Sequence, residues 1–315
     1  MTIWDGTGLP PAVQARVDRA RSSGVRSSLL DVPGHAGMAS CGFTPVGEVM
    51  GCIVEYIGFQ GYGGCGWYAG GLGSTWTGYG ASASPPVITS GDGSGSGWAG
   101  FGPYVDALHH GWGTALDRML VEARELGADG VVGVSLTEHH LGAGNREFMA
   151  LGTAVRSLGS THAARPFTTT LDGQDVAKLV HSGWMPAAII VGISVAIRHD
   201  DYATLMAQGA LAPNMEVVGL SELATAVRAD ARRQLATRAA RAGADGAILD
   251  SPVSLYVHEL EAGEGHRDHV AESSAVASAV VRYHKAETLP PSPLKMLPLA
   301  GARTTKRGST FGKPR

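Results

Sequence analysis

The chain has 315 residues, of which 44% are hydrophobic and 17% charged, and its net charge is −3 with 12 histidines. This length suffices for two domains of about 100–200 residues, and the charge excludes a general attraction to nucleic acids or membrane surfaces. The cysteines Cys41, Cys52 and Cys65 form no Cys-x-x-Cys pair, and no basic-then-apolar leader opens the sequence. These features predict a soluble protein of a reducing cytoplasm. The longest apolar run, residues 185–197, is shorter than the ~20 residues of a membrane span and is expected to be a buried strand.

Residues 1–160 predict a short helix followed by a small α+β unit. Residues 1–24 form an N-terminal extension, with a helix expected at 12–17 directly after two prolines. The spacing of apolar residues then predicts a strand at 48–57, a helix at 104–126 and strands at 131–138 and 148–157. The sequence Gly-Ala-Gly-Asn at 142–145 predicts the turn between the last two strands.

Residues 59–103, between the first strand and the helix, are rich in glycine and aromatic side chains. Such a composition does not form long regular elements. One interpretation is an aromatic loop that covers a ligand or contacts a protein partner. The alternative is a variable insertion, which folds tolerate easily in loops.

Residues 161–285 repeat the same plan. The sequence CGFTP at 41–45 returns as SGWMP at 182–186, and GADG at 127–130 returns at 243–246. The elements expected in this copy are the strand 188–198, a helix over 220–239 and the strands 247–259 and 270–283. Because internal repeats fix the domain count, two β-α-β-β domains are predicted, residues 25–160 and 161–285.

Residues 286–315 are basic and rich in proline, with no acidic residue after Glu287. This composition predicts a disordered tail. It offers the only surface for an anionic partner such as nucleic acid, and the alternative is a tail that is simply solvated.

The helix at 115–126 followed by GADGVVGV at 127–134, together with Gly-[Phe/Trp]-x-Pro before the first strand, resembles the YbjQ family of heavy-metal-binding domains. The resemblance covers about residues 25–285 and is weaker in the second copy, where AILD at 247–250 replaces VVGV. It implies an α+β fold of two YbjQ-like, dodecin-type domains, each a helix packed on a small sheet. It also implies assembly into a five-fold ring and no established catalytic activity.

Histidines are the candidate ligands for a transition metal such as Zn, Cu or Ni. Aligning VSL at 134–136 with VSL at 253–255 places His258 opposite His139. His140 points to the other strand face, so a site would need ligands from another strand or subunit. A second cluster contains His266 and His269. The alternative for all five is a solvated histidine or one satisfied within the core.

A thiol-dependent enzyme is a further alternative. The second copy has Ser182 and Ile193 in place of Cys41 and Cys52, so the fold does not require these cysteines, and Cys52 is expected to be a small buried hydrophobe. Cys65 lies between glycines and is expected to be exposed, but the sequence identifies no base beside it. No catalytic or cofactor-binding residue is assigned.

Eight residues are predicted to shape turns. Glycines are expected to end the two helices in a left-handed conformation, aspartates to brace the turns and further glycines to allow close strand entry. A proline marks the turn before the first strand of each copy. In that order the residues are Gly127, Gly243, Asp129, Asp245, Gly130, Gly246, Pro45 and Pro186.

The predicted function is a non-enzymatic, oligomeric binding module of the bacterial cytoplasm, for a heavy metal or small ligand. The first alternative is a structural scaffold or interaction protein of a larger assembly. Sheets of three strands leave exposed edges, so self-association is expected. Five chains supplying ten domains are the simplest closed solution, as two stacked rings in preference to one enlarged ring.

Overall fold

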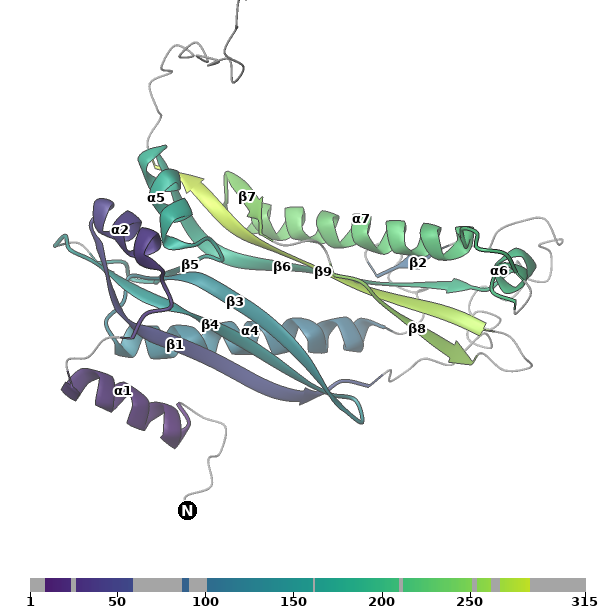
Figure 1. Ribbon diagram of the computed structural model, residues 1–315, viewed down its shortest axis with the longest axis horizontal. Coiled ribbons are helices and arrows are strands. Elements are labelled where there is room, and N and C mark those ends of the chain that lie inside the picture. The colour runs from purple at the N-terminus through teal and green to yellow at the C-terminus, as the bar shows by residue number, and fades with distance from the viewer. Residues whose placement is uncertain are drawn as a thin grey trace, which may run out of the picture. The chain divides into compact units, whose positions relative to one another are not determined.

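The computed structural model describes residues 9–23, 27–58, 87–90, 101–160, 162–209, 212–250, 254–261 and 267–283. All of them fall within one compact unit, residues 1–284. The fold is α+β, with two sheets and helices packed on them (Figure 1). Among the described residues, no helix is long and apolar enough to cross a membrane.

The N-terminal half, residues 27–160, builds a sheet with the order β1-β4-β3-β5. The bounds of these strands are β1 Phe43–Tyr56, β4 Asn145–Ser157, β3 Gly130–Gly142 and β5 Phe167–Thr168. The long helix α4 (Gly102–Glu125) packs on β1 and β4, and the short helix α2 (Val32–Ser40) precedes β1. Helix α1 (Pro11–Ser23) lies before this half.

The C-terminal half, residues 167–283, builds a sheet with the order β2-β6-β9-β7, and β8 also pairs with β9. The strand bounds are β2 Ile88–Thr89, β6 Trp184–His199, β9 Arg267–Arg282, β7 Gly246–Leu249 and β8 Tyr256–Glu261. The helices are α5 (Gly173–His181), α6 (Tyr202–Ala207) and α7 (Val218–Arg241), and α7 packs on β6 and β9.

The two halves exchange short strands. β5 belongs to the C-terminal half but pairs in parallel with β3, and β2 comes from the glycine-rich segment 59–103 but pairs with β6. The largest apolar core also contains side chains from both halves, including Leu108 and Trp112 of α4 with Ile193 of β6. The halves are therefore packed together as one folded unit.

The same contacts recur at corresponding positions of the two halves. A Cβ atom at Gly51 of β1 would lie 2.0 Å from the Ala115 carbonyl oxygen of α4, and one at Gly192 of β6 would lie 2.3 Å from that of Ala231 in α7. A β-bulge interrupts both strands, between Pro45 and Gly47 and between Pro186 and Ala188. The prolines thus lie inside strands rather than in turns, because a bulge tolerates the missing N–H donor.

The helix ends also correspond. Gly127 and Gly243 follow α4 and α7 with φ of +67° and +69°, the left-handed conformation expected there. Asp129 accepts a hydrogen bond from the Ser157 backbone N–H, and Asp245 accepts one from that of Arg282, both at 2.8 Å. Each aspartate therefore ties the turn after a long helix to the end of the last strand.

Gly130 and Gly246 differ in their surroundings. A Cβ atom at Gly130 would lie 2.2 Å from the Phe167 ring, whereas one at Gly246 would make only an ordinary contact with Val280. The close approach of the Phe167 ring therefore requires glycine at position 130, whereas position 246 has room for a side chain.

Several expectations from the sequence are wrong. The strand expected over 247–259 is two strands, β7 and β8, and helices α2, α5 and α6 were not expected. Phe101, grouped with the aromatic segment 59–103, is buried in the core at 1% exposure, and Cys52 is half-buried rather than buried. Residues 59–86 and 91–100, Cys65 and the tail 286–315 lie outside the described residues.

We expect Gly192→Ala to lower the free energy of unfolding by about 1–3 kcal/mol, since its methyl group would overlap backbone atoms of α7. Gly113→Ala is the control. No atom lies within 4 Å of a Cβ at Gly113, and alanine is the better helix former, so this variant is expected to gain up to about 1 kcal/mol. Urea unfolding measures both, and equal stability of Gly192→Ala and wild type would contradict the packing described.

Candidate functional site

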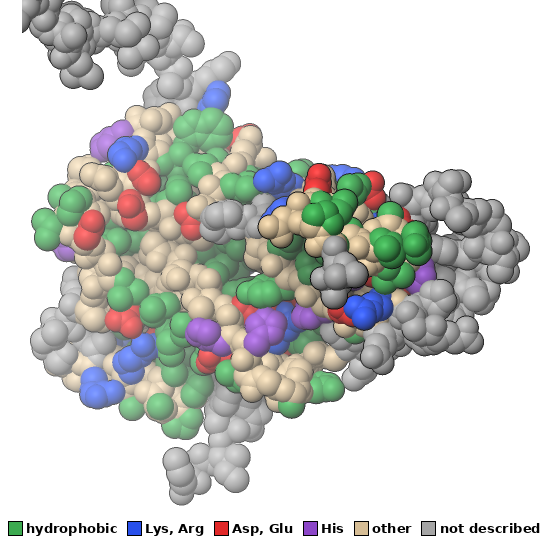
Figure 2. Space-filling view, turned by 45° about the vertical axis from the view of Figure 1, so that its right-hand side comes forward, with side chains coloured by type: hydrophobic (Ala, Val, Ile, Leu, Met, Phe, Trp, Pro, Cys, Tyr) green, Lys and Arg blue, Asp and Glu red, His purple; other side chains and the backbone are tan. Residues whose placement is uncertain are grey.

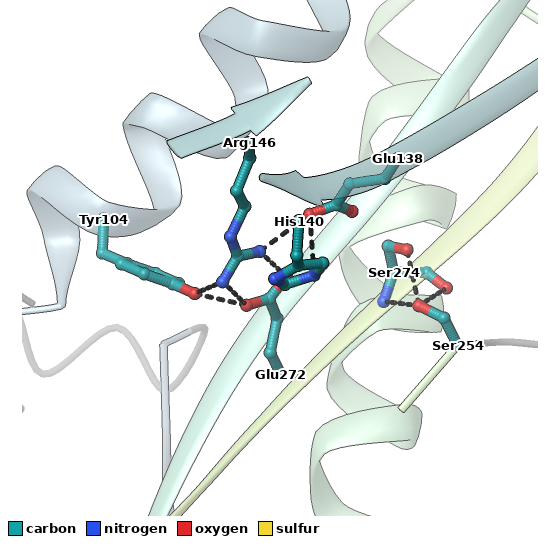
Figure 3. Close-up of polar contacts among 7 residues, drawn as sticks. All are labelled: Tyr104, Glu138, His140, Arg146, Ser254, Glu272 and Ser274. Carbon is teal, nitrogen blue, oxygen red and sulfur yellow. Dashed lines mark hydrogen bonds and ion pairs between the residues drawn. The ribbon is translucent and has the colours of Figure 1, made fainter. Parts of the chain in front are cut away.

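A buried polar cluster joins the two halves (Figure 3). Arg146 of β4 donates hydrogen bonds to Glu138 of β3 at 2.8 Å and to both carboxylate oxygens of Glu272 of β9 at 2.9 and 3.0 Å. Tyr104 of α4 accepts from Arg146 and donates its hydroxyl proton to Glu272. The guanidinium carbon also lies 5.3 Å from the centre of the Tyr104 ring. Two elements of one half, β4 and α4, thus hold the Glu272 carboxylate of the other half.

Little solvent reaches this cluster. The side chains of Arg146, Glu272 and Glu138 are 6%, 5% and 11% exposed. Two carboxylates share one guanidinium there, and charges so far from water are stable only when paired and hydrogen-bonded. Arg146 is therefore the residue on which the neutralisation of the cluster depends.

Burial shapes the protonation of these groups. It raises the pKa of Tyr104, and the nearby Glu272 carboxylate raises it further, so the phenol stays protonated. Burial and the charge of Glu272 also raise the pKa of Glu138 above its usual range. Burial alone would lower the pKa of Arg146, but its hydrogen bonds to Glu272 and the negative charges around it raise that pKa on balance. A sealed tyrosine and arginine of this kind suit a structural joint better than proton transfer to a substrate.

His140 and His258 lie at the edge of the cluster. His140 Nε2 is 3.7 Å from a Glu138 carboxylate oxygen, and the ring centres of His140 and Tyr256 are 5.3 Å apart. Burial lowers the pKa of His258; the Glu272 carboxylate opposes this shift, and Arg146 and His140 act in the same direction as burial. On the face of the molecule drawn in Figure 2, histidine side chains lie close to acidic and basic ones.

Next to the cluster, a serine network ties the segment before β8 to β9. The hydroxyls of Ser254 and Ser274 lie 2.7 Å apart, and the Ser273 hydroxyl donates to the Ser254 carbonyl at 2.6 Å. Figure 3 shows the Ser254–Ser274 contact beside Glu272. β8, which carries Tyr256 and His258, is thus fixed close to Glu272.

The alignment that placed His258 opposite His139 does not match the sheet register. His139 pairs with Glu147 in β4, whereas His258 pairs with Val270 in β9. The strand pairs Gly51–Ala150 and Gly192–Ala275 make Glu147 correspond to Glu272, whose partner across the strand is Tyr256. His139 instead forms an exposed contact with Glu147, with Nδ1 and Oε2 3.0 Å apart.

His269, from the second predicted cluster, lies in a buried ion-pair arrangement. Its Nδ1 is 2.7 Å from Asp200, and one residue along each strand His199 Nδ1 is 2.6 Å from Asp268. These two pairs join the end of β6 to the start of β9. His266 lies outside the described residues.

The described residues do not form a metal centre. Nowhere among them do three or more His, Cys, Asp or Glu side chains gather closely enough to hold a metal ion. His139 and His269 are each engaged by a carboxylate, so the described residues do not fit a zinc-type site with three or four ligands. Metal binding by the predicted histidines stays a prediction.

The structure places a histidine beside one cysteine. Cys41 Sγ lies 3.9 Å from His181 Nε2, which also contacts the Ser40 hydroxyl at 3.3 Å. His181 is exposed, and the thiol also donates to the Ala177 carbonyl. Sequence reasoning missed this pair because Cys41 and His181 come from different halves.

The chain is similar in sequence to one protein family and to several known proteins. Residues 99–157, which span α4, β3 and β4, match the YbjQ family model described as "Putative heavy-metal-binding". The chain is 29% identical to an encapsulin nanocompartment protein of Mycobacterium tuberculosis over 91% of this chain and 96% of that protein. It is also 47% identical over 53 residues to a UPF0145 protein of Archaeoglobus fulgidus and 40% identical over 63 residues to one of Methanocella arvoryzae. These last matches span about half the length of the UPF0145 proteins, 49% and 52%.

We expect Arg146→Ala to lower the free energy of unfolding by about 3–5 kcal/mol, because Glu272 and Glu138 would remain buried without a counter-charge. Combining Arg146→Met with Glu138→Gln and Glu272→Gln should recover most of this loss. The control Arg267→Ala breaks an ion pair whose side chains are 50% and 47% exposed, and should cost less than about 1 kcal/mol. A loss in Arg146→Ala no larger than that of the control, measured by urea unfolding, would show that the cluster does not stabilise the joint.

Proposed function

We propose that this chain is a non-enzymatic scaffold protein of the bacterial cytoplasm whose copies associate head to tail. The observation that carries the proposal is the contact between the two halves, in which α4 of one packs against β6 of the other. The long match to an encapsulin nanocompartment protein favours an assembly role, and the match at 99–157 favours a YbjQ-like domain in the N-terminal half. We infer that the C-terminal half is a second, diverged copy.

Within the chain, the contact between halves is apolar. Trp112 of α4 belongs to the same apolar core as Ile189 and Val191 of β6, and Leu116 packs against this core. Trp112 is 5% exposed, and its burial alone removes a large apolar area from water. In this contact the long helix of one half lies beside the first long strand of the other half.

The corresponding surfaces at the two ends of the unit are charged. Because Ala115 corresponds to Ala231, the α7 positions that match Trp112 and Leu116 of α4 are Arg228 and Arg232, and both arginines are exposed. A basic helix face therefore replaces the apolar one.

The first-strand edge of the N-terminal half is acidic. Glu48 of β1 and Glu122 and Glu125 of α4 lie on the side of β1 that faces away from β4. An α7 of a second chain, docked there as α4 docks on β6, would bring Arg228 and Arg232 to these carboxylates. Charge complementarity of this kind fixes partner and register.

Helix α1 covers the acidic edge in this structure. Arg16 donates to both oxygens of the Glu122 carboxylate at 2.6 Å and lies 3.9 Å from Glu48, and Arg21 pairs with Glu125 at 2.7 Å. Assembly would exchange these two arginines for those of the neighbouring α7. Helix α1 then acts as a replaceable cap on the docking surface.

A head-to-tail contact of identical chains closes into a ring or continues as a filament. Five chains can make this contact in one closed ring in which N-terminal and C-terminal halves alternate. Because each contact joins unlike halves, the single enlarged ring is favoured over two stacked rings. Native mass spectrometry should show about five times the 32.5 kDa chain mass. A stable monomer at micromolar concentration would overturn the proposal.

Reversing charge on one surface should break the assembly, and reversing both should restore it. We expect Arg228→Glu with Arg232→Glu to yield smaller species in native mass spectrometry, and Glu48→Lys with Glu125→Lys to do the same. The chain that carries all four changes should recover the assembly. As a matched control, Arg165→Glu with Lys178→Glu reverses two exposed charges that belong to neither surface. Failure of the fourfold variant to recover would exclude this pairing of surfaces.

Removing residues 1–24 should shift the chain toward larger assemblies, because the acidic edge of β1 is then uncovered. Sedimentation velocity at several concentrations measures the shift. Arg16→Ala with Arg21→Ala should act in the same direction while keeping the chain length. An unchanged distribution in both variants would mean that α1 is not a cap.

A further inference from the structure

A cavity of about 410 Å³ lies where α4 meets β6 and the end of α7. His109, Trp112 and Leu116 line it from α4, Ile189–Val191 from β6, and Arg238 and Arg241 from α7. Its size falls in the range of small-molecule sites. Its walls combine an apolar surface with two guanidinium groups.

The corresponding place in the N-terminal half holds a carboxylate. Glu122 of α4 is 1% exposed, accepts a hydrogen bond from the Met50 backbone N–H of β1 at 2.8 Å, and accepts two more from Arg16. Met50 is on the outer edge of β1, so its N–H has no strand partner there. The Glu122 carboxylate thus accepts hydrogen bonds from both the Met50 N–H and the Arg16 guanidinium.

In the C-terminal half, β6 has backbone N–H donors along its outer edge, but an arginine stands at the position that matches Glu122. Because Ala115 corresponds to Ala231, Glu122 corresponds to Arg238, and Met50 corresponds to Val191. The N–H groups of Ile189 and Val195 point to the outer edge of β6, where they donate to Thr168 and Ser90. Alternation along the strand directs the Val191 N–H to the same edge and into the cavity.

The two arginines of the cavity lining, Arg238 and Arg241, are exposed to solvent. Neither Arg238 nor Arg241 forms an ion pair with a described carboxylate, and Asp106 is the acid that acts on Arg238 from a distance. Burial, and then the charge of Arg241, lower the pKa of Arg238. Burial and Arg238 lower the pKa of His109 to about 4, so this imidazole is neutral at pH 7 and can accept or donate one hydrogen bond.

We propose that this cavity binds a small organic carboxylate with an apolar body. The carboxylate takes the place that the Glu122 side chain occupies in the other half, between the Val191 N–H and the guanidinium of Arg238, with Arg241 beside it. The apolar body lies against Trp112, Leu116 and Ile190. Arginine and carboxylate match in geometry, since two parallel N–H donors meet two oxygens. The site does not depend on the scaffold role.

The test measures benzoate binding to the full chain by isothermal titration calorimetry. Benzyl alcohol and inorganic phosphate separate the contributions of charge and apolar body, and both should bind at least about tenfold more weakly than benzoate. Arg238→Met and Arg241→Met should each weaken benzoate binding by about tenfold or more. Arg238→Glu, which restores the carboxylate of the other half, should abolish it.

The control Arg165→Met removes an exposed arginine outside the cavity lining and should leave benzoate affinity unchanged. No detectable benzoate binding at millimolar concentration would overturn the proposal. Affinity for benzoate in Arg238→Met and Arg241→Met equal to that of wild type would overturn it as well. Phosphate binding as tight as benzoate would show a site for charge alone and would overturn the apolar part. Because each variant is also weighed by native mass spectrometry, loss of binding is distinguishable from loss of assembly.

Discussion

The arrangement of this protein depends on the burial of α4 on two sides. One face packs on its own sheet through Ala115, Met119 and Ala123, as α7 packs on the other sheet through Ala231, Leu235 and Ala239. A second face of α4 carries Trp112, whose ring packs edge to face on Phe148 of β4 and which shares an apolar core and a cavity lining with residues of β6. The joint between the halves and the cavity beside it both follow from this second apolar face, which α7 lacks.

Different residue types at corresponding positions of the two halves give these positions different surroundings. Glu122 accepts a hydrogen bond from the Met50 N–H of β1, whereas Arg238 at the corresponding position of α7 lines a cavity together with Val191 of β6. A repeat that was identical in both halves would present identical edges and could associate in any order. Unlike edges restrict which surface meets which, and such restriction is how an assembly avoids wrong registers.

Periodicity in the sequence predicted the long elements, because α4, α7 and the inner strands carry regular apolar spacing. It could not predict α2, which contains Pro33, Gly34 and Gly37. This helix forms because Asp31 caps its first turn and its glycines pack closely on Gly173 of α5. The polar cluster was also missed, since Arg146 and Glu272 lie 126 residues apart and meet only when the halves pack. The mismatch of His139 and His258 arises from the break between β7 and β8, which an alignment of residues does not reveal.

The buried cluster adds geometric selectivity to an apolar joint. Apolar side chains such as Trp112 and Ile193 pack well over a range of small displacements, so they hold the halves together without fixing the angle between the sheets. Arg146 has a planar fork that must meet Glu138, Glu272 and Tyr104 at once, and a shift of one residue in β9 would leave buried charges unpaired. The apolar face therefore supplies most of the stability of the joint, and the charged cluster determines its register.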